Sequence, residues 1–129
     1  MEIVRRAFAA FEQRDAVALL AVCAPDIVFE PVTARLIAGG EPYRGHAGMR
    51  RYLEDVARVW QELRPAPDAF HVGEGGVVVA TGRVHAWGIG RVIDSPAAWL
   101  WRIQDGRIAY GRIFGSAEDA LEAAGLQPS

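Results

Sequence analysis

Three histidines and one cysteine are the side chains best suited to metal binding or nucleophilic catalysis, but their spacing supports neither. His46, His71 and His85 lie far apart and share no ligand spacing such as H-x-x-x-H, so the sequence predicts no metal site. Cys23 is the only cysteine, which excludes an internal disulfide and a cysteine-based metal site. It lies in an apolar helical stretch, so we expect a buried, inert thiol.

Aromatic side chains are the second feature with chemical potential. Trp60, Trp99 and Trp101 stand out, and Trp99 and Trp101 share one face of an expected strand. Indole rings give wide apolar walls with a single N–H group, which suits flat, ring-bearing ligands. The alternative for each ring is ordinary core packing or a dimer interface.

The glycine-rich segments do not predict a nucleotide site. Residues 73–76 lie between two expected strands, whereas a dinucleotide-binding loop joins a strand to a helix. Residues 88–90 are typical of a bulge or a hairpin bend. We expect no cofactor.

Composition indicates one globular domain over residues 1–129, because 51% of the residues are hydrophobic and 23% are charged. The net charge of −2 does not favour binding to nucleic acid or to an anionic membrane. No apolar stretch approaches the ~18 residues that a membrane span needs, and the N-terminus lacks the apolar core of a signal peptide. We therefore expect a cytoplasmic protein.

Helical periodicity dominates the first half of the chain. Residues 3–13 form an apolar stripe at helical spacing, and Asp15 suits the N-cap of a short second helix that ends before Pro25. Residues 46–61 predict the longest helix. A final short helix is expected over 117–124.

Strand patterns account for most of the remainder. Residues 26–32 alternate and are rich in β-branched and aromatic side chains, and residues 33–45 resemble a loop. Gly75-Gly76 and Asp105-Gly106 are hairpin turn signals. Period-two patterns predict four further strands, at 63–73, 76–88, 92–104 and 107–115. This order indicates an α+β fold with helices on one face of a curved antiparallel sheet.

Five segments, in this order, give the chain a family resemblance. They are Phe11–Asp15, Pro25–Pro31, Tyr43–Arg50, Trp101–Ile108 and Ala120–Leu126. The ordered set is similar to the SnoaL-like group of the NTF2-like superfamily, which includes polyketide cyclases, ketosteroid isomerases and limonene epoxide hydrolases. The resemblance implies a cone-shaped sheet around an apolar pocket and a homodimer. It does not select one function, because members of this superfamily include enzymes, ligand binders and dimerisation modules.

Glu30 is the catalytic residue that the resemblance implies. Val28–Pro31 looks like the ketosteroid isomerase segment whose carboxylate, just before a proline, moves the substrate proton. A carboxylate in an apolar pocket has a raised pKa, which suits a general base. The alternative is a strand-end carboxylate that faces water or pairs with an arginine.

Other positions depart from the catalytic patterns of these relatives. The places of the two isomerase oxyanion donors correspond to Ala7 and Trp99, of which only the indole donates a hydrogen bond. Ser116 occupies the place after Phe114 where relatives often carry an aspartate. Arg83, Glu30 and Asp94 could together replace the catalytic set of the epoxide hydrolases. Their spacing in the sequence does not require that they come together.

Arg83, His85 and Trp87 alternate on one face of a strand, which we expect to be the outer side of the sheet, where relatives often dimerise. The leading hypothesis is a homodimer that binds a small apolar, cyclic metabolite, with isomerase, cyclase or dehydratase chemistry if it is an enzyme. The alternatives are a non-catalytic carrier and a protein-interaction module with a filled pocket. The candidate site comprises the base Glu30 and the wall residues Phe8, Phe11, Trp60, Trp99 and Trp101.

Overall fold

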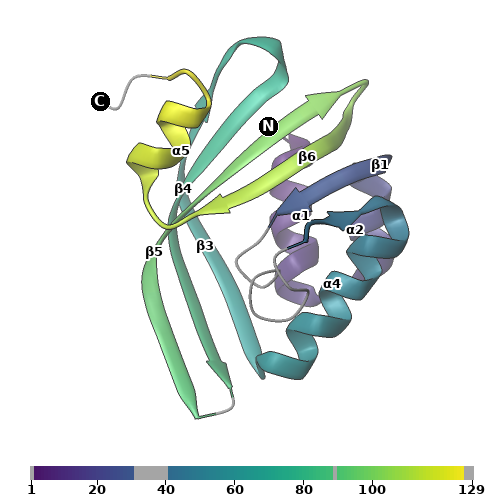
Figure 1. Ribbon diagram of the computed structural model, residues 1–129, viewed down its shortest axis with the longest axis vertical. Helices are drawn as coiled ribbons and strands as arrows, with labels where there is room; N and C mark the ends of the chain where they lie inside the picture. The colour runs from purple at the N-terminus through teal and green to yellow at the C-terminus, as the bar shows by residue number, and fades with distance from the viewer. Residues whose placement is uncertain (1, 31–40, 89, 127–129) are drawn as a thin grey trace.

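The computed structural model describes residues 2–30, 41–88 and 90–126, and their arrangement is an α+β fold (Figure 1). The helices are α1 (Glu2–Gln13), α2 (Ala16–Val22), α4 (Gly45–Val59) and α5 (Ala117–Ala123), with a 3-10 turn η1 (Glu74–Gly76). The strands are β1 (Cys23–Glu30), β2 (Tyr43–Arg44), β3 (Glu62–Val72), β4 (Val77–Gly88), β5 (Arg91–Gln104) and β6 (Arg107–Phe114). The predicted helices and the four late strands are confirmed.

The strands form one curved sheet in the order β2-β1-β6-β5-β4-β3 (Figure 1). Strands β3 to β6 are the antiparallel meander that the sequence predicted. β1, however, pairs with β6 in parallel, so the sheet is mixed and not purely antiparallel. Parallel neighbours need a long crossover connection, and here the whole chain between β1 and β6 supplies it.

The first strand and the segment after it differ from the predicted boundaries. β1 begins at Cys23 and so includes Pro25, which was expected to precede it. Tyr43 and Arg44 form β2 where a loop was expected, because they pair antiparallel with Phe29 and Val28. The predicted end of the first strand at residues 31–32 and the loop at 33–40 lie outside the described residues.

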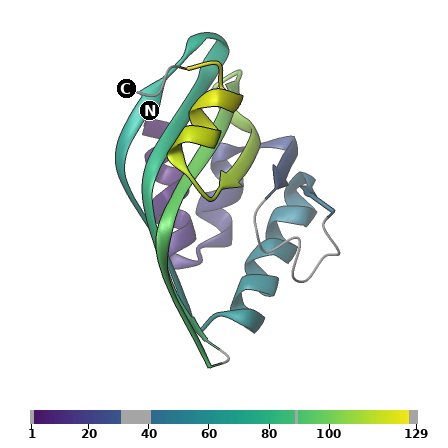
Figure 2. The same cartoon turned by 60° about the vertical axis from the view of Figure 1, so that its left-hand side comes forward.

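Two apolar clusters cover opposite faces of the sheet, and the helices that pack on them lie on its two sides (Figure 2). The inner face, defined here as the face toward α1, α2 and α4, carries Val78, Ala80, Trp99 and Trp101 among its buried side chains. The outer face carries Val77, Val79, Ala98 and Leu100, which pack against Ala120 and Leu121 of α5. The three helices that precede the meander, α1, α2 and α4, therefore cover one face as predicted, and the short C-terminal helix α5 covers the other.

Local chemistry explains several element boundaries. The Asp15 carboxylate accepts a hydrogen bond from the Ala18 amide at 3.1 Å and caps α2 as predicted. Asp105 and Gly106 have φ values of 53° and 74°, the pair of positive angles that a tight hairpin between β5 and β6 requires. The other turn signal, Gly75-Gly76, lies in η1 between β3 and β4.

The surroundings of Cys23 and His46 fit structural roles and not catalytic ones. Burial raises the pKa of the Cys23 thiol to about 12, so the thiolate that a nucleophile needs is not populated near neutral pH. His46 Nε2 lies 3.0 Å from the Cys23 carbonyl oxygen and joins the start of α4 to β1. Among the described residues, no group of three metal-ligating side chains occurs, and no helix has the length and apolarity to cross a membrane.

Candidate functional site

A cavity of about 200 Å³ lies between α4 and the inner face of the sheet. Its walls are aromatic and aliphatic side chains from seven elements, because long strands curve away from the helix that covers them. The lining comprises Phe11 and Arg14 at the end of α1, Phe29 of β1, Tyr52, Leu53, Val56 and Trp60 of α4 and its C-cap, Leu63 and Pro65 of β3, Val84 and Ala86 of β4, Ser95, Pro96, Ala97 and Trp99 of β5, and Ile113, Phe114 and Gly115 at the end of β6.

Three of the five predicted wall residues line this cavity. Phe11, Trp60 and Trp99 face it, whereas Phe8 and Trp101 do not belong to the lining. Phe8 packs edge-on against Trp99, with ring centroids 5.0 Å apart, and so supports the wall from behind.

Trp101 is a core residue rather than a ligand contact. Its indole is 1% exposed and stacks on Phe29 at 5.8 Å with an interplanar angle of 9°. Its Nε1–H is buried and has no hydrogen-bond partner within the described part of the chain. Trp99 and Trp101 share the inner face as predicted, but Trp99 lines the cavity whereas Trp101 is packed in the core.

Glu30 does not point into the cavity, and this corrects the position that the sequence predicted. Strand alternation places Phe29 on the inner face, so its neighbour Glu30 lies on the outer face. There Tyr110 Oη donates a hydrogen bond to Glu30 Oε2 at 2.5 Å. Burial and this hydrogen bond both raise the pKa of Tyr110. That Glu30 acts as a base remains a prediction, and its position away from the cavity does not support it.

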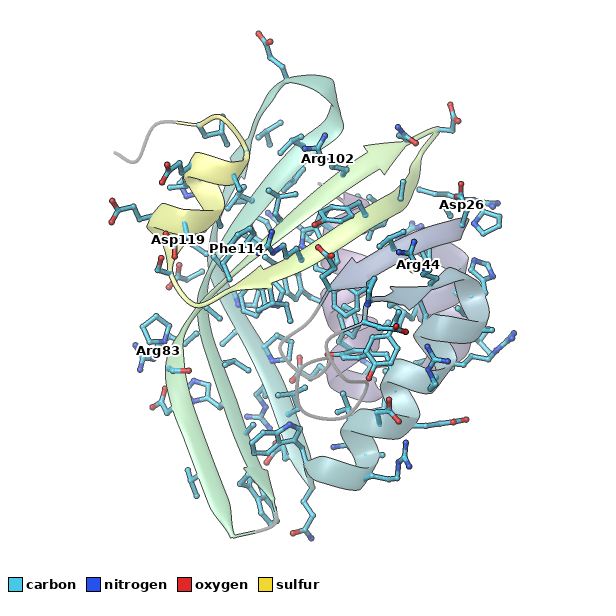
Figure 3. The ribbon with its side chains drawn as sticks, viewed as in Figure 1. Asp26, Arg44, Arg83, Arg102, Phe114 and Asp119 are labelled. Atoms are coloured by element: carbon cyan, nitrogen blue, oxygen red, sulfur yellow. The ribbon has the colours of Figure 1, made fainter. Side chains whose placement is uncertain are left out.

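Arg83, His85 and Asp94 form an ion-pair group on the exposed outer face. Arg83 Nε lies 2.9 Å from Asp94 Oδ1, and His85 Nδ1 lies 3.3 Å from the same oxygen. The Arg83 guanidinium lowers the pKa of Asp94. Figure 3 shows Arg83 on the side of the sheet away from α1, α2 and α4. The outer-face prediction for Arg83 and His85 is confirmed, and the epoxide hydrolase set is not assembled at the cavity.

Sequence reasoning missed the polar groups of the cavity. The lining includes Arg14, Ser95 and Tyr52, and Arg14 is the formally charged member. Burial raises the pKa of Tyr52, which favours its neutral hydroxyl further. Arg14 follows the last residue of an amphipathic helix, a position that carries no recognisable functional motif. No carboxylate, histidine or cysteine belongs to the lining in the described part of the chain.

Comparison with known proteins decides the family. The model of the SnoaL-like domain matches residues 4–111. The chain belongs to the SnoaL-like family. None of the curated proteins matches this SnoaL-like chain.

Solved structures share the fold of this SnoaL-like domain over nearly its whole length. An NTF2-like protein of unknown function from Burkholderia pseudomallei is 25% identical, with a TM-score of 0.80 over 96% of this chain and 95% of that chain. TerC, co-crystallised with polyporic acid, is 23% identical, with a TM-score of 0.79 over 95% of each chain. A Catenulispora acidiphila protein with a ketosteroid isomerase-like fold, in complex with trimethylamine, is 19% identical, with a TM-score of 0.75 over 98% of this chain and 94% of that chain. These similarities confirm the predicted NTF2-like fold.

Proposed function

We propose that this SnoaL-like domain binds a small, ring-bearing apolar metabolite in the cavity beside α4. The observation that carries the proposal is a lining of aromatic and aliphatic side chains in which Trp60 and Trp99 provide flat walls. Such concave, mostly apolar sites with a few polar groups are typical of small-molecule binding sites.

The volume of the cavity sets the size of the ligand. In another protein an apolar cavity of about 150 Å³ holds one benzene molecule. The cavity of about 200 Å³ therefore suits one substituted ring or two fused rings. TerC, which shares the fold, was crystallised with polyporic acid, and this supports a ring-bearing ligand as a hypothesis for this chain.

Binding without carboxylate-driven proton transfer fits the lining better than the isomerase chemistry of the family. A general base must lie within hydrogen-bond reach of the proton that it removes. Glu30 lies on the other face of the sheet, beside Tyr110. The interaction-module hypothesis is less well supported, because it expects side chains to fill the cavity.

A bulkier side chain at Val84 tests the proposal. Val84 lines the cavity and is half-buried, so Val84→Phe adds volume where the ligand would lie. We expect 2-naphthamide, a neutral two-ring probe, to quench the fluorescence of Trp60 and Trp99 in the unmodified protein. We expect Val84→Phe to weaken its affinity at least about tenfold, the effect of losing roughly 1.4 kcal/mol of binding.

Glu30→Gln separates the binding proposal from the general-base hypothesis. We expect this variant to bind 2-naphthamide as the unmodified protein does, because Glu30 lies on the outer face. Native mass spectrometry and denaturing extraction would show whether a metabolite co-purifies and provide a compound for turnover assays. Unchanged affinity in Val84→Phe would contradict the proposal that the ligand binds in the cavity. Loss of turnover in Glu30→Gln would instead support Glu30 as the general base.

We also propose that the chain forms a homodimer through the outer face of β3, β4 and β5 below α5. Trp87 is 45% exposed and Val92 is 84% exposed on that face, where the strands extend past α5 (Figure 1). These two residues are cross-strand neighbours, and contiguous exposed apolar side chains with a polar rim mark interaction surfaces. Sedimentation equilibrium should give twice the chain mass, and Trp87→Glu should shift it toward the monomer. A monomer in the unmodified protein would refute this arrangement.

A further inference from the structure

We propose that Arg14 recognises an acidic oxygen of the ligand, so that the cavity takes a ring-bearing carboxylate or a similarly acidic ring compound. This inference rests on the proposed function and adds the charge of the ligand to it. It follows from the charge of the lining, from the backbone at residue 14 and from the contacts of the Arg14 side chain.

The lining residues that the structure describes carry a formal positive charge. Arg14 is the formally charged side chain among the described lining residues, and it lies at the wall formed by the end of α1. Within the described residues, no carboxylate lies within salt-bridge distance of Arg14. Residues 31–40 contain no Asp or Glu. A cation beside apolar walls favours a ligand that brings the compensating negative charge.

The backbone at Arg14 is held in a conformation that favours glycine. Arg14 has a φ of 53°, in the left-handed region. Its amide bonds to the Phe11 carbonyl at 3.2 Å, and the Asp15 amide bonds to the Ala10 carbonyl at 3.0 Å. This pair of bonds is the Schellman ending of a helix, in which the left-handed residue is usually glycine. An arginine there costs backbone strain, and strained residues of this kind cluster at ligand sites.

The side chain of Arg14 is fixed by one of its three nitrogens. Nη2 donates to the Trp60 carbonyl at 3.0 Å and to the Gln61 carbonyl at 2.9 Å. These bonds cap the C-terminal end of α4, which a cation favours. In the described part of the chain, Nη1 and Nε have no acceptor, so the planar guanidinium is oriented by one edge while its other donors remain for a carboxylate.

Arg14 is exposed, so its charge keeps contact with water while the cavity itself is apolar. An anionic group at this edge would keep part of its hydration, and the ring system would occupy the space beside Trp60 and Trp99. The geometry therefore fits a ligand with an apolar body and one acidic end.

A matched pair of probes tests this inference. At neutral pH 2-naphthoate is ionised and 2-naphthamide is neutral, although the two have nearly the same size. We expect the unmodified protein to bind 2-naphthoate about tenfold more tightly than 2-naphthamide at low ionic strength, as one charge-assisted hydrogen bond would give. The preference should shrink toward equality near 1 M salt, where the Debye length is about 3 Å.

Three variants assign the preference to Arg14. Arg14→Gln should remove it while 2-naphthamide binding is retained, and Arg14→Lys should keep most of it. Arg102→Gln removes one positive charge from the exposed outer face (Figure 3) and should leave the preference unchanged. A purely structural role would instead weaken both probes equally in Arg14→Gln and Arg14→Lys, and this result would overturn the inference. Equal binding of the two probes by the unmodified protein would overturn it as well, with the proposed function intact. Binding of neither probe would overturn both.

Discussion

Gly111→Ala is expected to lower the free energy of unfolding by about 1–3 kcal/mol, the usual cost of overpacking a core. A Cβ atom at residue 111 would lie 2.5 Å from Trp101 Cζ3 and 2.9 Å from Phe29 Cδ1. Both rings are buried and stacked on each other, so neither can move without disturbing the other. Thermal denaturation should show a Tm lower by roughly 5–10 °C.

Gly115→Ala is the matched control for this variant. Gly115 lies four positions along the chain, and no atom approaches within 4 Å of a Cβ built there. Its free energy of unfolding should therefore change by no more than roughly 0.5 kcal/mol, as for ordinary surface substitutions, and its Tm should stay close to that of the unmodified protein. Equal Tm values for the two variants would show that the space above Gly111 is not closed by Trp101 and Phe29.

None of the three tyrosines is expected to ionise near pH 10 while the protein is folded, although 10.0 is the ordinary tyrosine value. Burial raises the pKa of Tyr43, of Tyr52 and of Tyr110. Hydrogen bonds add to the shift, because Tyr43 donates to the buried Asp55 at 2.6 Å and Tyr110 donates to Glu30 at 2.5 Å.

Because these tyrosine pKa values are raised, the free energy of unfolding should depend on pH in the alkaline range. A group whose pKa is higher in the folded state contributes stability that is complete below its unfolded pKa, about 10 for tyrosine. This contribution is lost as the pH rises through the folded values, because the unfolded chain then releases protons that the folded chain retains. The free energy of unfolding should therefore fall steadily above about pH 10.

Ultraviolet absorbance of tyrosinate gives the measurement. A titration should show little tyrosinate near pH 10 in buffer and the ordinary transition in denaturant, where all three hydroxyls are exposed. Tyr110→Phe should leave two delayed tyrosines. One tyrosine that titrates normally in buffer would mean that its hydroxyl is open to solvent in the folded protein.

Local signals in the sequence predicted the elements well, because their causes are local. The Asp105-Gly106 turn needs two positive φ angles, and the residue types alone favour them. The parallel contact between β1 and β6 was not predictable in this way. It joins Val28 to Tyr110, and no neighbouring residue reports such a distant pairing.

The candidate site was predictable only in part, for a reason of geometry. Of the aromatic residues expected to bind a ligand, Phe11, Trp60 and Trp99 line a cavity and Phe8 and Trp101 do not, and ligand binding itself stays a prediction. Glu30 was placed by resemblance to a relative, but one step along a strand reverses the face, and Phe29 occupies the inner one. Arg14 was missed as a lining residue because it lies at a left-handed helix end that the sequence does not mark.

The residues of β3 restrict edge-to-edge pairing between the sheets of two molecules. β3 is the last strand of the sheet, and an uncovered last strand can add a strand from another chain. Pro65 and Pro67 offer no amide hydrogen for such a ladder, and the register shifts between Pro67 and Ala69. The two prolines thus oppose the addition of a strand along the β3 edge, and with it the growth of fibrils by that route. The homodimer proposed above would avoid this edge, because it forms through the faces of the sheets, and a two-fold contact of that kind closes after two molecules.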